Sequence, residues 1–413
     1  MADEGAIARR ALMHAVRERG AAKDDAVARA LLTVPRHVFL PGIPLEEVYR
    51  DDAIVTKRDS DGVPISSSSQ PTIMAIMLDQ LGLAPGHRVL EIGAGTGYNA
   101  ALLAQLVGPD GEVVSIDIDD DVVERARAGL AAAGPDHERV TVVCDDGARG
   151  YPDRAPYDRI IATVGVWDLS PAWLEQLAPG GRIVAPLDLH GAQVSVAFER
   201  GDGGWVSRSL VPCGFMQLRG EMAGPGQTVV LGRPPKMLAV IVPDARVVDA
   251  EALRAALTGD PHAIATGVRL RADESGDLGT WLAVTESRSC GLSGDPDASP
   301  ALADALMQSG SFRATPGIAE SNGIAVLSRR AAGDEVYASG YGPDGERLAT
   351  DLAARVRDWE SAGRPGPARL GITAYPLDTP GPLDGIVITK AHTRIVVSVR
   401  PEQASARELA ERP

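Results

Sequence analysis

Short apolar runs alternate with helical patterns between residues 88 and 199 of this chain. Apolar runs bounded by turn residues predict buried strands, and apolar positions at a spacing of three to four residues predict helices. The expected strands lie at 88–92, 112–116, 139–144, 158–163, 181–186 and 193–199. The expected helices lie near 98–107, 120–133 and 170–177. This alternation predicts an α/β fold with a doubly wound, mostly parallel sheet that carries helices on both faces.

Helical patterns also precede this region, at 3–20 and 24–34, and another begins near Pro71, a residue that suits the first turn of a helix. We therefore expect a first domain over 1–218 that starts with N-terminal helices. Residues 219–237 are rich in glycine and proline and predict a linker.

A second, α+β accessory domain is expected over 238–401, followed by a tail at 402–413. Its expected strands are 238–242, 264–271, 279–285, 323–329, 335–340, 368–374, 385–389 and 394–399. Its expected helices are 249–257 and 345–360. About 160 residues suffice for an independent core.

Composition narrows the possible partners. The 413 residues carry a net charge of −15 and show no basic stripe, which argues against nucleic acid. No apolar run approaches the roughly 18 residues that span a bilayer, so no membrane partner is expected. The three cysteines are far apart and match neither a disulfide framework nor a metal site, which favours a cytoplasmic location without a bound metal. The sequence does not indicate an oligomeric state.

The segment VLEIGAGTGYN (residues 89–99) combines a buried-strand pattern with three glycines and the start of a helix. Glycines at this spacing let a ligand approach the backbone. Twenty residues after Gly97, the next apolar run ends in Asp117, where a carboxylate can accept hydrogen bonds from a ribose. The spacing GxGxG differs from the dinucleotide pattern GxGxxG, and a glycine-rich turn without a ligand is the other alternative.

Five segments together resemble protein-L-isoaspartate O-methyltransferases, within the class I S-adenosylmethionine-dependent methyltransferases. They are VPRHVFLP (34–41), the glycine loop with its helix (89–104), CDDG (144–147), APYDRII (155–161) and LAPGGRIV (177–184). The first of these is not general to methyltransferases. The resemblance covers about the first 215 residues and implies a class I, Rossmann-like methyltransferase fold.

The resemblance implies that S-adenosyl-L-methionine is the cofactor. Glu91 and the glycines would cradle its methionine part, Asp117 would hold the ribose, and Asp146 with Gly147 would meet the adenine edge. The full expected set is Glu91, Gly93, Ala94, Gly95, Thr96, Gly97, Tyr98, Asn99, Asp117, Ile118, Asp145, Asp146, Gly147 and Thr163.

The active-site loop departs from the family pattern, because it contains Ser66, Ser67, Ser68 and Ser69 in a row before Gln70. Either end of this run aligns with the family's hydroxyl residue, and a flexible solvent loop is the alternative. We expect the serines to bind the substrate carboxylate. His37 is a further candidate, equally well explained as a structural histidine. Trp167 stands where the family has small residues, so it either reshapes the substrate cleft or only packs.

The predicted enzyme is a carboxyl O-methyltransferase that acts on an aspartyl or isoaspartyl side chain of a peptide or protein. Methylation would lead to aspartimide and isoaspartate chemistry. The C-terminal extension resembles that of enzymes that mature ribosomal peptides, so maturation is the favoured role and general repair of damaged proteins the alternative. A small-molecule methyltransferase and a non-catalytic binding module are the alternatives of other classes.

Overall fold

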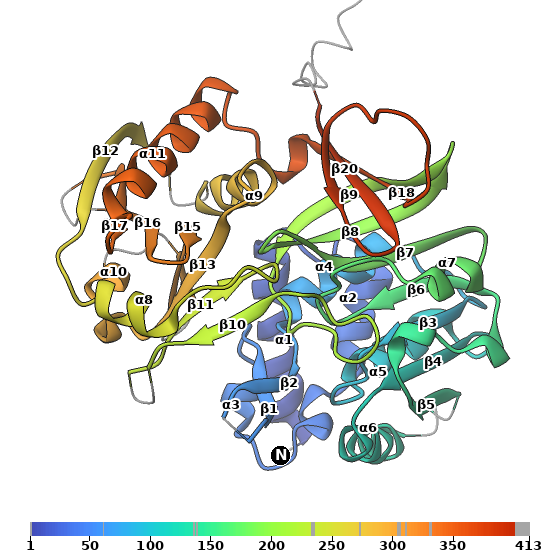
Figure 1. Cartoon of the computed structure of the whole chain (residues 1–413). Coiled ribbons are helices and arrows are strands. Elements are labelled where there is room, and N and C mark those ends of the chain that lie inside the picture. Colours follow the sequence, from blue (N-terminus) through green and yellow to red (C-terminus); the bar gives the residue numbers. More distant parts are fainter. Residues whose placement is uncertain are drawn as a thin grey trace, which may run out of the picture.

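The computed structural model describes residues 2–60, 62–134, 137, 139–232, 236–271, 274–303, 307–309, 312–329 and 333–400. The predicted tail at 402–413 and residues 233–235 of the predicted linker lie outside the described residues. The described strands form a 10-stranded sheet, an 8-stranded sheet and a two-stranded hairpin (Figure 1). No described helix is both long and apolar enough to cross a membrane.

The 10-stranded sheet has the order β19-β20-β18-β9-β8-β7-β6-β3-β4-β5. The neighbouring strands β7-β6-β3-β4-β5 pair in parallel, and the remaining pairs are antiparallel. The strands are β3 Arg88–Ile92, β4 Glu112–Asp117, β5 Val140–Cys144, β6 Tyr157–Ala162, β7 Leu177–Leu189, β8 Ala192–Gly201, β9 Gly204–Cys213, β18 Leu370–Pro376, β19 Ile386–Thr389 and β20 Thr393–Val399. The predicted α/β class is confirmed, but the expectation of a mostly parallel sheet is wrong beyond β7.

The antiparallel part follows from two tight turns. His190–Gly191 connects β7 to β8, and Asp202–Gly203 connects β8 to β9. Both glycines have positive φ, 97° and 80°, which two-residue hairpin turns require. Asp-Gly is a strong hairpin signal, so the sequence does indicate β9, which the prediction above omits.

Alternate side chains of the parallel strands enter two separate cores. Val89, Val113 and Ile161 pack into a core with the helices α1, α2, α4, α5 and α6. Leu90 and Ile116 enter the opposite core, which includes Trp173 of α7. The helices are α1 Ala2–Glu18, α2 Asp25–Thr33, α4 Pro71–Leu81, α5 Tyr98–Val107, α6 Asp120–Ala133 and α7 Pro171–Gln176. The two cores explain why these strands read as nearly continuous apolar runs.

Four short elements connect the N-terminal helices to α4. They are the 3₁₀ helix η1 Arg36–Phe39, the helix α3 Leu45–Val48, and the hairpin strands β1 Ile54–Arg58 and β2 Pro64–Ser68. The serine run therefore begins as a strand, not as an irregular loop. It ends at Gln70, directly before Pro71 opens α4.

The 8-stranded sheet has the order β10-β11-β13-β15-β16-β17-β12, with β14 paired to β15. Its strands are β10 Gln227–Val230, β11 Leu238–Val242, β12 His262–Arg269, β13 Ser289–Gly294, β14 Met307–Ser309, β15 Phe312–Glu320, β16 Gly323–Arg329 and β17 Glu335–Tyr341. Helices α8 Ala250–Ala256, α9 Ser275–Thr285, α10 Pro300–Ala303 and α11 Gly345–Ser361 accompany it.

One predicted strand of this region is wrong, because residues 279–285 belong to the helix α9. Leu278 and Leu282 lie one helical turn apart and are both buried, so they form a short apolar stripe. The apolar run around them looks like a strand, since a short apolar segment cannot be assigned from its period alone.

The last strands of the chain do not join the second sheet. β18 pairs with β9, through Thr373 opposite Val206 and Ala374 opposite Trp205. In Figure 1 the red strands β18 and β20 therefore lie beside β8 and β9. The domains predicted at 1–218 and 238–401 remain a prediction, and the two sheets divide the chain differently from it.

Two buried polar side chains anchor these last strands. Asp168, fully buried, accepts hydrogen bonds from the backbone N–H of His392 (2.6 Å) and the hydroxyl of Thr393 (2.6 Å). The Nζ of Lys390 donates to the carbonyl of Asp188 (3.0 Å) and lies 5.0 Å from the centroid of the Trp167 ring. These contacts join residues 390–393 to the loop that follows β6 and to the last residues of β7.

We predict that Asp168→Ala lowers the free energy of unfolding. It leaves the backbone N–H of His392 and the buried hydroxyl of Thr393 without their acceptor, which costs on the order of 2 to 4 kcal/mol. Denaturant titration followed by circular dichroism measures the change. Asp153→Ala, at an exposed carboxylate, is the control and should change stability by less than about 0.5 kcal/mol. Equal effects of the two substitutions would contradict the anchoring role.

Candidate functional site

A cavity of about 530 Å³ lies beyond the carboxyl ends of β3, β4 and β6. One wall is the glycine loop after β3 together with Asp117, and the opposite wall is the serine segment of β2 and the start of α4. A third wall is formed by residues 212–219. The position agrees with the rule that ligands of open α/β sheets bind at the carboxyl edge.

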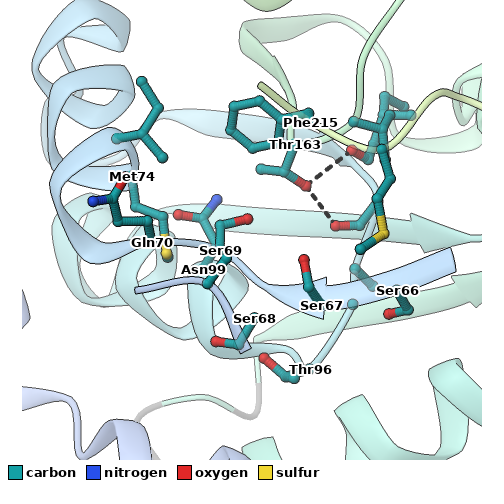
Figure 2. Close-up of a pocket in the computed structure, with 18 of the residues that line it drawn as sticks. Ser66, Ser67, Ser68, Ser69, Gln70, Met74, Thr96, Asn99, Thr163 and Phe215 are labelled. Atoms are coloured by element: carbon teal, nitrogen blue, oxygen red, sulfur yellow. Dashed lines mark hydrogen bonds between the residues drawn. The ribbon is translucent and has the colours of Figure 1, made fainter. Parts of the chain in front are cut away.

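The glycine loop brings most of the predicted cofactor residues to the cavity. Its lining includes Gly93, Ala94, Gly95, Thr96, Tyr98, Asn99, Asp117, Ile118, Gly147 and Thr163. Gly93 has φ 97°, and a Cβ there would lie 2.9 Å from Oγ1 of Thr163, so only glycine fits. The Thr163 hydroxyl donates to the carbonyls of Gly93 (2.7 Å) and Ile92 (3.2 Å), as the dashed lines in Figure 2 show.

Gly97 lies outside the cavity lining and has a packing role. It precedes α5 with φ 84°, and a Cβ there would approach the backbone of Ala126 within 3.0 to 3.1 Å. This glycine therefore lets α5 and α6 come close together. The sequence pattern predicts that Gly97 contacts the ligand. The packing against Ala126 explains the glycine without such a contact.

Asp117 ends β4 and borders the cavity. Its carboxylate accepts hydrogen bonds from the N–H of Gly95 (3.0 Å) and of Asp119 (3.3 Å). Burial raises the pKa of this carboxyl, although both hydrogen bonds act in the opposite direction. Asp117 thus holds the glycine loop to the tip of β4.

Glu91 is fully buried and does not line the cavity. It accepts hydrogen bonds from Nδ2 of Asn99 (2.7 Å) and from the Ser115 hydroxyl (2.5 Å). Burial raises the pKa of the Glu91 carboxyl to about 7. The structure therefore places Glu91 behind Asn99, which does reach the cavity.

The acids after β5 also face elsewhere. Asp146 accepts hydrogen bonds from the N–H of Ala148 (2.9 Å) and of Glu221 (2.7 Å), and Asp145 pairs with Arg149. Neither carboxylate lines the cavity, whereas Gly147 does. The predicted contact of this turn with an adenine edge remains a prediction that rests on Gly147.

All four serines line the cavity, but their hydroxyls differ. The Ser66 hydroxyl accepts from Thr56 (3.3 Å), and the buried Ser68 hydroxyl accepts from Arg36 (3.4 Å). The hydroxyls of Ser67 and Ser69 have no hydrogen-bond partner among the described residues, and Figure 2 shows them between β2 and the opposite wall. These two hydroxyls are therefore free to bind a ligand.

His37 is not part of the cavity. Its Nδ1 lies 2.7 Å from the Tyr49 hydroxyl, and burial together with the charge of Arg9 lowers its pKa. This position favours the structural explanation. Trp167 is also outside the lining and packs against Lys390 and Gly224.

The segment 212–223, which we call the cover segment, was not predicted to be part of the site. Its Met216 carbonyl accepts from Gly165 (2.8 Å), and Arg219 pairs with Asp119 (2.7 Å). Asp119 also pairs with Lys57 of β1 (2.9 Å). The cover segment thus crosses the strand tips and is linked through Asp119 to the serine hairpin, which is the β1–β2 hairpin with Ser66–Ser68 in its second strand. Its sequence shows no strand or helix period that would indicate this role.

Comparisons with known proteins identify the family that the chain resembles. A family model described as protein-L-isoaspartate(D-aspartate) O-methyltransferase matches residues 7–223. A protein-L-isoaspartate O-methyltransferase of Methanopyrus kandleri is 39% identical over 225 residues, which are 54% of this chain and 96% of the relative. The enzyme of the same name from Hyperthermus butylicus is 38% identical over 222 residues, 52% of this chain and 89% of the relative.

A solved structure named protein-L-isoaspartate O-methyltransferase is similar over nearly the whole molecule. The alignment covers 95% of this chain and 99% of the solved chain, with a TM-score of 0.51 and 25% sequence identity. The similarity therefore extends past the glycine-loop region into the C-terminal part.

We predict that Glu91 makes the protein less stable as the pH rises. Between pH 5 and 8 the carboxyl of the unfolded chain is already ionised, while the buried one holds its proton up to about pH 7. The contribution of the Glu91 carboxyl to the free energy of unfolding should therefore fall by on the order of 2 kcal/mol over that range. The free energy of unfolding of the wild type should fall relative to that of Glu91→Gln, measured by denaturant titration. A difference that does not vary with pH would exclude a raised pKa.

Proposed function

The chain belongs to the protein-L-isoaspartate(D-aspartate) O-methyltransferase family, and from this premise we propose that it methylates the carboxylate of isoaspartyl residues in proteins or peptides. The methyl donor of the family is S-adenosyl-L-methionine. After esterification, the neighbouring amide nitrogen can attack the ester carbonyl, lose its proton and close a succinimide ring, with methanol as the leaving group. Hydrolysis of that ring returns part of the damaged protein to normal aspartate.

The observation that carries the proposal is the pair of facing walls in one cavity. The glycine loop and Asp117 form the wall suited to the donor, and the Ser67 and Ser69 hydroxyls lie on the wall suited to a carboxylate. A cavity of about 530 Å³ is within the usual range for a small-molecule site, roughly 300 to 1,000 Å³.

The residues present fit the donor. Asp117 offers carboxylate oxygens at a strand tip, where ribose hydroxyls can donate to them. Gly93 and Gly95 remove side chains from the adjacent backbone, and Asn99 reaches the same space. When bound, S-adenosyl-L-methionine supplies an electrophilic methyl group on a sulfonium.

The serine wall suits a carboxylate nucleophile. A carboxylate is ionised at neutral pH, so the transfer needs orientation more than a general base. Two neutral hydroxyls can orient the carboxylate by hydrogen bonds and leave its negative charge on the attacking oxygen. Among the described lining residues there is no histidine or lysine, and the one cation, Arg219, is paired with Asp119.

Maturation of a ribosomal peptide, through methylation of a chosen aspartate to an aspartimide, is the finer alternative. The C-terminal extension no longer favours it, because the solved structure described above is similar over 95% of this chain and is named for isoaspartate. The serine run remains the feature that departs from the family pattern.

Two peptides that differ only in one aspartyl linkage distinguish these roles. With a labelled donor, we expect base-labile label on the isoaspartyl peptide and almost none on the aspartyl peptide. Preference for the aspartyl peptide would favour maturation. Label that resists base would indicate N- or C-methylation and a different class of methyltransferase.

For the donor wall, we predict that Asp117→Ala weakens binding of S-adenosyl-L-homocysteine. Loss of a buried acceptor for ribose hydroxyls should raise the Kd about 10- to 100-fold. Isothermal titration calorimetry measures the Kd, and Asp153→Ala is the matched control. An unchanged Kd would remove Asp117 from the donor site.

For the serine wall, we predict that Ser67→Ala and Ser69→Ala each reduce kcat/KM for an isoaspartyl peptide about 10- to 100-fold, because each removes a hydrogen bond to a charged group. The Kd for S-adenosyl-L-homocysteine should stay within about twofold. Ser66→Ala, whose hydroxyl is bonded to Thr56, should lose less activity. Full activity of Ser67→Ala and Ser69→Ala together would show that the substrate binds elsewhere.

A further inference from the structure

A buried arginine lies beneath the serine segment. Arg36 belongs to η1, and its side chain has no exposed surface. Its Nη1 donates to the carbonyls of Val48 (2.8 Å) and Arg50 (3.3 Å). Its Nη2 donates to the carbonyls of Asp52, Ser68 and Ser69 (3.2, 3.5 and 3.1 Å) and to the Ser68 hydroxyl (3.4 Å).

One guanidinium thus joins two separate stretches of chain. The first, residues 48–52, leads into the hairpin, and the second, Ser68–Ser69, ends it. Nη1 serves residues 48–50, and Nη2 bridges Asp52 and Ser68–Ser69, so a lysine ammonium, which is a single point donor, can keep only part of these contacts. The described residues provide no carboxylate ion pair for Arg36, so its partners are neutral oxygens.

These contacts determine where the other groups of the serine segment point. The N–H of a trans peptide points opposite to its C=O. The carbonyls of Ser68 and Ser69 are directed to Arg36, so the N–H groups of Ser69 and Gln70 are directed away from it. Neither N–H has an acceptor among the described residues. Ser69 and Gln70 both line the cavity.

The alternation of side chains along β2 completes the arrangement. Ser68 turns its hydroxyl toward Arg36, so its neighbour Ser67 turns its hydroxyl to the other side of the strand, toward the cavity. A shift of the strand register by one residue would turn the hydroxyls of Ser67 and Ser69 toward Arg36 and away from the cavity. The buried guanidinium favours the observed register, since it bonds the carbonyls of Ser68 and Ser69 and the hydroxyl of Ser68 together.

We propose that Arg36 is a positioning residue for substrate binding: it holds Ser68 and Ser69 so that the hydroxyls of Ser67 and Ser69 and the N–H groups of Ser69 and Gln70 together receive the substrate carboxylate. The inference rests on the proposed function and names the residue that organises its carboxylate site. The positive charge of Arg36 also polarises the two peptide groups toward an anion in the cavity.

The test compares Arg36→Lys with the wild type on an isoaspartyl peptide. We expect KM for the peptide to rise at least tenfold, while the Kd for S-adenosyl-L-homocysteine stays within about twofold, because Arg36 makes no hydrogen bond to the described residues of the donor wall. Added guanidinium at millimolar concentration should lower the KM of Arg36→Ala again. Arg159→Lys is the matched control, since Arg159 also donates to backbone carbonyls, those of Leu81 and Gly82, away from the cavity.

The outcomes separate the inference from the proposed function. No turnover of the isoaspartyl peptide by the wild type would overturn the proposed function. Wild-type turnover with an unchanged KM in Arg36→Lys would overturn this inference alone, as would an equal loss of peptide and donor binding. If the Arg36 variants do not fold, Ser68→Ala decides, because it removes one Arg36 contact only: KM should rise about threefold, and an unchanged KM would overturn the inference.

Discussion

Parallel strands end at the same edge of a sheet, and the candidate site of this protein depends on that constraint. β3, β4 and β6 deliver the glycine loop, Asp117 and Thr163 to one place although up to 70 residues separate them in sequence. The remaining walls come from segments outside the parallel sheet, namely the serine hairpin and the cover segment. Asp119 connects both, because it pairs with Lys57 and with Arg219. The site is therefore built on rigid strand tips and completed by segments tied to them.

Where strong local patterns exist, the sequence predicts this architecture closely. α5 and α6 begin and end as expected, and β3 does so too, because apolar period and turn residues agree there. Predictions that depend on the direction of a side chain are less accurate. Glu91 belongs to the glycine motif yet is buried behind Asn99, and Asp146 is occupied by the N–H groups of Ala148 and Glu221. A motif fixes the position of a residue along the chain, whereas the neighbours that take up its hydrogen bonds come from distant segments.

The serine run illustrates the same limit. Its composition alone is compatible with a solvent loop, and no spacing rule distinguishes its four hydroxyls. The structure separates them through Thr56 and Arg36, which lie 10 and 32 residues away from their partners. Arg36 itself stands in a segment that the family resemblance already singles out, but its six acceptors on two stretches of chain are visible only in three dimensions. The sequence of the cover segment does not indicate its position. That position depends on hydrogen bonds to Gly165, Gln193 and Asp146, which are distant in sequence.

The addition of β18, β20 and β19 to the first sheet has a consequence for biosynthesis. A ribosome releases residues 370–399 after every other strand of that sheet, so β9 remains an open edge on the nascent chain until then. Open edges recruit other strands and promote association of chains. Closing this edge joins segments about 170 residues apart, a slow type of contact to form. Production of the protein should therefore benefit from slow growth or from chaperones that shield β9 while translation finishes.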